Sequence, residues 1–165
     1  MKRFIKCTLS LIIFLALAFW AVLLFGPSSV FAAGTVTVTS ENCWSGMCTM
    51  VVTATADATD GSFPATTLRP IHGLFYYCVN DPGATAPTDD WDYTLTDAAG
   101  RDLLGTGGTD EDEAVTGINY ANDGTNNIFT GLPINEAPVL TITGNSVNSA
   151  VIVFTIVSRR VLPER

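Results

Sequence analysis

Lysine is missing from this sequence after position 6, and histidine occurs only once, as His72. Beyond residue 32 the positive charges are five arginines, which stand against all 16 acidic residues and give a net charge of −11. Such a chain has no basic stripe with which to displace counterions from a phosphate backbone. The composition therefore argues against nucleic acid as a partner.

The sequence beyond residue 32 also lacks any segment with the 3.6-residue period of an amphipathic helix. It consists of short β-type runs rich in Thr and Val, separated by turn signals such as Asp60-Gly61 and Asp81-Pro82-Gly83. This pattern predicts an all-β fold, an antiparallel β-sandwich of the jelly-roll type with seven or eight strands. The expected strands are residues 35–39, 50–56, 74–79, 91–96, 127–130, 139–143 and 150–157.

The N-terminal segment has the layout of an export signal. Three positive residues within the first six precede an apolar run from Leu9 to Phe25, and Val30-Phe31-Ala32 places small residues where a signal peptidase recognises them. This order predicts a signal peptide cleaved after Ala32, and a protein exported to the periplasm, cell surface or medium. The alternative is an uncleaved membrane anchor, because residues 7–25 are nearly long enough to span a bilayer.

The length of the chain limits it to one domain after this segment. The 133 residues that follow position 32 suffice for a single core and are too few for two comfortable ones. We therefore expect a signal peptide or anchor at 1–32, a single β-sandwich domain at 33–157 and a C-terminal tail at 158–165.

Three cysteines remain after removal of the signal, namely Cys43, Cys48 and Cys78. An odd number allows one disulfide within the monomer and leaves one thiol. Proximity in the chain favours a hairpin disulfide between Cys43 and Cys48. Cys78 lies in an apolar run and is then expected to be a buried, inert thiol. No C-x-x-C motif is present, so we predict no redox activity.

The hydrophobic pattern places a condition on this disulfide. A regular ladder that opposes Cys43 to Cys48 pairs odd with even positions, so the valines of residues 35–39 would not share a face with the apolar positions of residues 50–56. Either a β-bulge corrects the phase, or Cys48 pairs instead with Cys78.

The segment from Leu104 to Tyr120 is rich in glycine and acidic residues, and we expect a long, mobile, acidic loop there. Its run from Asp110 to Glu113 offers the oxygen ligands that calcium prefers, with Asp110 and Asp112 as the candidate ligands. The run lacks the spaced D-x-D-x-D-G pattern that wraps around one ion, and a solvated loop is the alternative. No other cofactor is indicated.

Candidate catalytic groups are sparse. His72 has no neighbouring Ser, Cys or acidic partner in the sequence, which leaves neither a triad nor a zinc site. Among Asp89, Asp90 and Asp92, a pair of carboxylates could serve as the acid and base of a glycosidase. They lie in a turn that leads into a strand, where capping and solvation account for them. The sequence therefore predicts a protein that is not an enzyme.

Four aromatic residues, Trp44, Trp91, Tyr76 and Tyr77, could form a platform for sugar rings. Trp91 begins a strand and is expected in the core. Trp44 lies in a turn with Ser45 and Gly46, so we expect it to be exposed and take it as the candidate ligand-binding aromatic.

The run at residues 150–157 is apolar on both faces. A strand of this kind lies at the centre of a sheet and is covered on both sides, or it is covered by another subunit. Assembly with a protein partner or with further copies of the chain is therefore a prediction to test.

Several short motifs between Ala54 and Val157 follow one another in a characteristic order and spacing. Through them the chain resembles a recurring type of small β protein encoded by tailed phages and prophages, generally uncharacterised or described as virion structural proteins. The resemblance carries no catalytic residues, and the export signal and the cysteine pair depart from it. Its motifs are Ala56-Asp57-Ala58, Gly61, Asp81-Pro82-Gly83-Ala84-Thr85-Ala86-Pro87-Thr88-Asp89, Asp92-Tyr93-Thr94-Leu95-Thr96-Asp97, Gly100, Asp102-Leu103-Leu104 and Pro138-Val139-Leu140-Thr141-Ile142-Thr143-Gly144-Asn145-Ser146.

The sequence thus predicts an exported, non-enzymatic structural or interaction module, and the resemblance suggests a phage-derived part of an assembly. The alternatives are a carbohydrate-binding module that uses exposed aromatics such as Trp44, and a hydrolase based on Asp89, Asp92 and the acidic loop.

Overall fold

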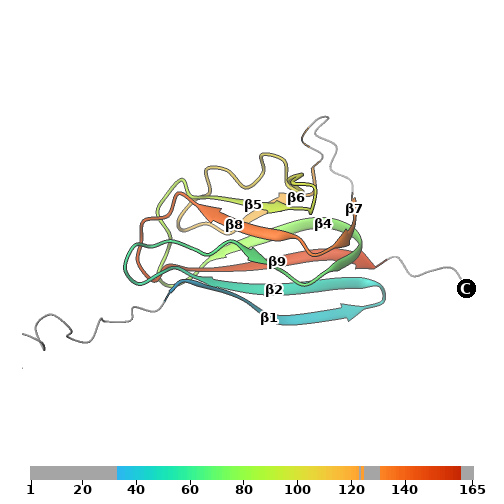
Figure 1. The fold of residues 1–165 in the computed structure, drawn as a ribbon, viewed down its shortest axis with the longest axis horizontal. Coiled ribbons are helices and arrows are strands. Elements are labelled where there is room, and N and C mark those ends of the chain that lie inside the picture. Colours follow the sequence, from blue (N-terminus) through green and yellow to red (C-terminus); the bar gives the residue numbers. More distant parts are fainter. Residues whose placement is uncertain (1–32, 123, 125–130, 161–165) are drawn as a thin grey trace, which may run out of the picture. The chain divides into compact units, whose positions relative to one another are not determined.

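The computed structural model of the protein describes residues 33–122, 124 and 131–160. These residues form nine β-strands and no helix (Figure 1), which confirms the all-β prediction. The strands are β1 (Thr35–Trp44), β2 (Met47–Thr55), β3 (Thr66–Thr67), β4 (Ile71–Pro82), β5 (Asp92–Thr96), β6 (Gly117–Tyr120), β7 (Leu132–Glu136), β8 (Val139–Thr143) and β9 (Val151–Arg160).

The strands form two antiparallel sheets. The larger sheet has six strands in the order β1-β2-β9-β4-β6, with β7 paired to the other half of β4, and the smaller sheet has the order β3-β8-β5. The long strand β4 accommodates both neighbours because β7 pairs with residues 71–75 and β6 with residues 77–80. The strand β9 therefore lies inside the larger sheet, between β2 and β4.

Alternate side chains of both sheets meet in one core, as expected of a β-sandwich. Val52 and Phe154 contribute from the larger sheet, and Tyr93 contributes from the smaller one, each at most 1% exposed. Trp91 is fully buried, stacks on Tyr93 with ring centroids 5.6 Å apart and meets Phe154 edge-on at 6.1 Å. The prediction that Trp91 belongs to the core is confirmed.

Six of the predicted strands are present, and the predicted strand at 127–130 lies outside the described residues. The short strands β3, β6 and β7 were not predicted from the sequence. The boundary of the predicted tail at residue 158 also differs, because β9 continues through Arg160 in its pairing with β4.

The β1–β2 hairpin resolves the conflict between the disulfide and the hydrophobic pattern. A bulge between Val38 and Ser40 shifts the register, so that Val38 pairs with Val52 while Cys43 pairs with Cys48. The sulfurs of Cys43 and Cys48 lie 2.07 Å apart, as the pairing by proximity predicted. A two-residue turn closes the hairpin, and both of its residues have positive φ, as a type I′ turn requires.

The segment predicted as a solvated loop from Leu104 to Tyr120 is different in the structure. Its last residues form β6, and its backbone is fastened to β5 by a hydrogen bond from the Tyr93 N–H to the Gly108 carbonyl, 2.7 Å. Glu111, in the middle of the acidic run, is only 9% exposed. The prediction of a mobile loop is therefore wrong for β6 and for Glu111, because partners far away in the sequence bury them.

The predicted signal peptide, its cleavage site at Ala32 and the alternative anchor at 7–25 lie outside the described residues. Within the described part of the chain, no helix is long and apolar enough to cross a membrane.

Candidate interaction surface

The larger sheet has one face in the core and a second face that points away from it, which we call the outer face. Strand register assigns its members, because residues paired across antiparallel strands point to the same side. The outer face consists of Thr35, Thr37, Ser40, Asn42 and Trp44 of β1, Met47, Thr49, Val51, Thr53 and Thr55 of β2, Val151, Val153, Thr155, Val157 and Arg159 of β9, His72, Leu74, Tyr77, Val79 and Asp81 of β4, Ile118 and Tyr120 of β6, and Pro133 and Asn135 of β7.

The outer face is nearly free of charge. Its members are mainly Thr, Val and aromatic residues, and only Asp81 and Arg159 carry a charge. All members except Val157 are partly or fully exposed. An extended neutral surface on a strongly acidic protein is typical of a binding interface.

The strand β9 explains the apolar character of the centre of this face. Ile152, Phe154 and Ile156 point into the core and are at most 1% exposed, whereas Val153 and Thr155 on the other side are partly exposed. The central position predicted for this strand is confirmed. The other side of β9 was expected to be covered by the rest of the chain or by another subunit. In the structure it forms the middle of the outer face.

Large apolar side chains extend the outer face at the β6 edge. Ile118 is 53% exposed and Tyr120 is 51% exposed. The Tyr120 ring lies against that of Tyr77 with centroids 5.9 Å apart. These two residues were not predicted from the sequence as part of a site, because they fall in the segment expected to be a loop. The alternation of Ile118 and Tyr120 with polar neighbours was the available signal.

Trp44 lies at the opposite edge of the outer face, at the tip of the β1–β2 hairpin. Its side chain is 83% exposed, which confirms the predicted exposure. Together with Asn42 and Met47 it lines a shallow groove on the hairpin. Of the four aromatics that could form a sugar platform, Trp91 is excluded by its burial in the core.

The candidate calcium ligands do not gather around a common point. Asp110 and Asp112 are exposed, and a carboxylate oxygen of Asp112 accepts the N–H of Ala114 at 2.7 Å. Within residues 33–122, 124 and 131–160 there is no group of three or more His, Cys, Asp or Glu side chains that could hold a metal ion.

Glu111, between the two candidates, points inward to an amide network. Its carboxylate accepts a hydrogen bond from the Asn80 side-chain amide at 2.8 Å and another from Asn119. The Asn119 amide also donates to the Tyr93 hydroxyl oxygen at 2.8 Å. This network fastens the acidic segment to β4, β5 and β6.

Of the candidate hydrolase residues, Asp92 has a structural partner. Asp92 accepts the backbone N–H of Asp110 at 3.0 Å, and Asp89 is exposed in the turn before β5. His72 lies near the start of β4, and its Nδ1 is 2.6 Å from the side-chain oxygen of Asn135 on β7. The described residues therefore do not place His72, Asp89 and Asp92 in one hydrogen-bonded constellation.

Cys78 is the free cysteine of the described structure and is 1% exposed. Burial raises the pKa of its thiol to about 12. Since the thiolate is the reactive form, the thiol is shielded both by its surroundings and by its protonation.

We expect the Cys78 thiol not to react with an aromatic disulfide reagent in the native protein at pH 8. After denaturation without reductant, the chain cleaved after Ala32 should release one thiol, because Cys43 and Cys48 are bonded. Spectrophotometric titration measures both values. Rapid reaction of the native protein, or a disulfide-linked dimer on a non-reducing gel, would contradict this burial.

The chain matches no protein-family model, no curated protein sequence and no solved structure. Its resemblance to phage-encoded proteins therefore stays a prediction from sequence motifs.

Proposed function

We propose that the protein is an exported, non-enzymatic structural module that associates with further copies of itself through the outer face. The observation that carries this proposal is an extended, neutral, partly apolar sheet face on a chain with a net charge of −11 after residue 32. Acidic copies repel each other over most of their surface. The outer face is the surface on which contact adds apolar burial without bringing carboxylates together.

The geometry of the face suits association of identical copies. A two-fold axis pairs a patch with itself, and this requires a surface that is complementary to its own copy. A face of Thr and Val, with its one carboxylate and its one guanidinium on separate strands, meets that requirement. In a two-fold arrangement Asp81 of one copy can also face Arg159 of the other.

Export is supported by the disulfide and by the N-terminal segment. A bonded pair such as Cys43 and Cys48 is compatible with an oxidising compartment. The apolar segment before Ala32 is the predicted export signal. The resemblance to phage structural proteins adds a class in which small β modules are built into larger assemblies.

Substitution of Thr155 by glutamate tests the self-association. Thr155 lies at the middle of the outer face, paired with Val51 on β2 and Val79 on β4. A charge placed there is desolvated in any interface formed by this face. We expect association to weaken by about 100-fold or more, measured by light scattering on the protein purified after export.

Thr141→Glu is the matched control, because Thr141 is a partly exposed threonine on the middle strand of the smaller sheet. It adds the same charge on a different surface and should leave association unchanged. A wild-type protein that stays monomeric at about 100 μM, which corresponds to no more than weak association, would overturn the proposal.

A carbohydrate-binding module is the second candidate, and the exposure of Trp44 favours it. An indole that is 83% exposed beside a polar groove offers a stacking surface for a sugar ring. If the protein has this function, we expect binding to a glycan array to be lost in Trp44→Ala and largely retained in Trp44→Phe. Equal binding by wild type and Trp44→Ala would reject it.

A further inference from the structure

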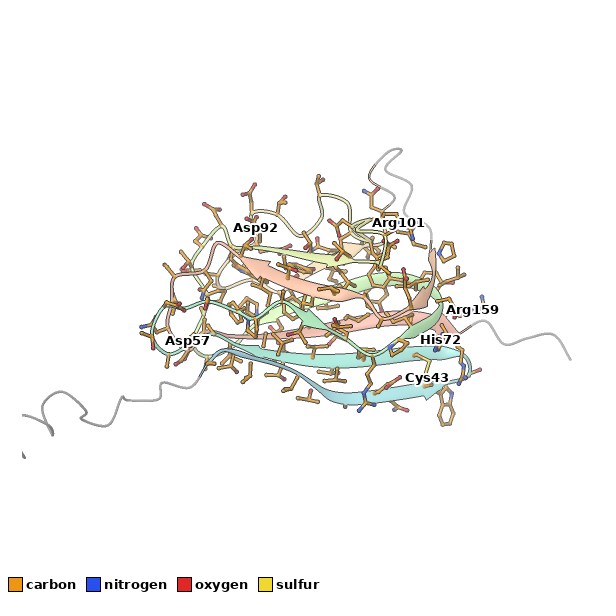
Figure 2. The ribbon with its side chains drawn as sticks, viewed as in Figure 1. Cys43, Asp57, His72, Asp92, Arg101 and Arg159 are labelled. Atoms are coloured by element: carbon orange, nitrogen blue, oxygen red, sulfur yellow. A yellow bond between two sulfur atoms is a disulfide. The ribbon has the colours of Figure 1, made fainter. Side chains whose placement is uncertain are left out.

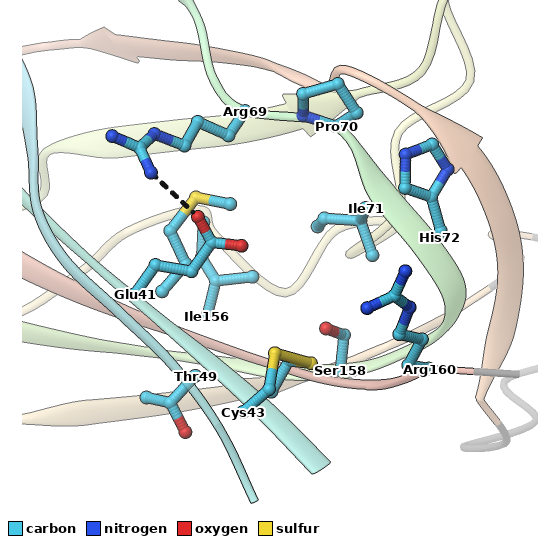
Figure 3. Close-up of a pocket in the computed structure, with 12 residues that line it drawn as sticks. Glu41, Cys43, Thr49, Arg69, Pro70, Ile71, His72, Ile156, Ser158 and Arg160 are labelled. Atoms are coloured by element: carbon cyan, nitrogen blue, oxygen red, sulfur yellow. Dashed lines mark hydrogen bonds and ion pairs between the residues drawn. A yellow bond between two sulfur atoms is a disulfide. The ribbon is translucent and has the colours of Figure 1, made fainter. Parts of the chain in front are cut away.

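A pocket of about 320 Å³ lies between the β1–β2 hairpin and the segment from Arg69 to His72 (Figure 3). It is on the core side of the larger sheet, at the end that carries the disulfide. Buried apolar side chains line it together with the sulfurs of the disulfide. These side chains are Met50, Ile71 and Ile156.

Cationic and polar groups surround this apolar floor. Figure 3 shows the Arg160 guanidinium and the Ser158 side chain on one side of the pocket, and an ion pair on the other. In that pair, Arg69 and Glu41 are 3.0 Å apart, so Arg69 is already compensated. Arg160 has no ion-pair or hydrogen-bond partner for its side chain among the described residues.

Ser158 is the most informative of these groups. It is only 7% exposed, and its hydroxyl has no hydrogen-bond partner within the described part of the chain. No fully buried side-chain nitrogen or oxygen among the described residues lacks a hydrogen-bond partner, so the Ser158 hydroxyl is open to solvent and is not sealed in the core. Its position in the pocket leaves it available to a bound molecule.

We propose that this pocket binds a small organic carboxylate with a compact apolar body. The carboxylate pairs with the Arg160 guanidinium and accepts a hydrogen bond from the Ser158 hydroxyl. The apolar body lies on Met50, Ile71 and Ile156. This binding is independent of self-association, because the pocket and the outer face lie on opposite sides of the larger sheet.

The size and the charge of the pocket both select this class. A volume of about 320 Å³ is near the lower limit of ligand pockets, which excludes large molecules. Positive charges are few in a chain of this acidity, yet Arg69 and Arg160 line the pocket, and Figure 2 shows Arg159 at the same end of the molecule, which carries Cys43 and lies opposite Asp57. An anion is therefore attracted to this end and repelled elsewhere.

The test is a titration with hexanoate, followed by NMR at the backbone amides of Ile71 and Ile156. Hexan-1-ol and sulfate are the two comparison ligands, since one lacks the charge and the other lacks the apolar body. We expect hexanoate to bind at least about 10-fold more tightly than either, because a charge-assisted hydrogen bond and apolar burial then act together.

Adjacent arginines supply a matched pair of variants. Arg160 lines the pocket, whereas Arg159 pairs with Met47 and Leu74 on the outer face. Arg160→Gln should weaken hexanoate binding by about 10-fold or more, and Arg159→Gln, with the same change in net charge, should leave it unaltered. Arg160→Lys should restore part of the affinity, since it keeps the charge and loses the bidentate geometry.

Three results would overturn the proposal. They are equal binding of hexanoate and hexan-1-ol, equal losses in Arg159→Gln and Arg160→Gln, and the absence of shifts at Ile71 and Ile156 in millimolar hexanoate.

Discussion

Trp91→Ala is expected to lower the free energy of unfolding by about 4 kcal/mol, a large part of the stability of a domain of this size. The indole is fully buried, and it contacts Tyr93 and Phe154 from the two sheets. Its loss removes both ring contacts and leaves a cavity that the surrounding strands can fill only partly. Urea denaturation followed by circular dichroism measures the change.

Trp44→Ala provides the control for this prediction. The same substitution at an 83% exposed position should change stability by less than about 0.5 kcal/mol. Because an assembly formed by the outer face would cover Trp44, the comparison is made at a concentration where the protein is monomeric. A similar loss of stability in both variants under that condition would contradict the exposure of Trp44 and the special role of Trp91 in the core.

The strand pattern could be predicted from the sequence wherever it depended on local alternation. Residues 139–143 and 150–157 carry enough Val, Ile and Thr for a strand whatever their neighbours. The bulge in β1 was also accessible, because Val38 and Cys43 could not both satisfy a regular ladder. The bulge is the structural consequence of satisfying the disulfide and the core at once.

The acidic segment could not be predicted in the same way. Asp110, Glu111 and Asp112 are equivalent in a sequence pattern, yet only Glu111 is buried. Glu111 is the buried one because its carboxylate accepts hydrogen bonds from Asn80, which lies 31 residues earlier in the chain on β4, and from Asn119 on β6. The Gly-rich stretch before it gives no periodicity, so local sequence carried no sign of this burial.

The candidate sites show the same division between local and distant information. Exposure of Trp44 followed from its turn, whereas the pocket depends on Arg69 meeting Glu41 across 28 residues. The end of β9 then serves both sites, because alternation sends Arg159 to the outer face and Arg160 to the pocket. The two functions inferred for the chain can therefore be separated by neighbouring substitutions.

Glu111→Ala is expected to destabilise the protein by about 3 kcal/mol, because it leaves the buried Asn80 amide without its acceptor and removes one of the two acceptors, Glu111 and Tyr93, that hold the Asn119 amide. Asn80 is fully buried, so water cannot replace the carboxylate there. Asn119 belongs to β6, and the loss should also loosen the neighbouring Ile118 and Tyr120 on the outer face. Self-association should therefore weaken together with stability.

The control is Glu113→Ala, which removes an exposed carboxylate from the same acidic run and should change stability by less than about 0.5 kcal/mol. The stability of Glu111→Gln should lie between those of the two alanine variants, because the glutamine amide keeps one acceptor oxygen. Its NH2 group replaces the second carboxylate oxygen and therefore faces another hydrogen-bond donor. Thermal unfolding and light scattering on the three variants measure both effects. Equal stability of Glu111→Ala and Glu113→Ala would show that the acidic run is solvated along its whole length, and that β6 is held to the sheet by its backbone pairing with β4 alone.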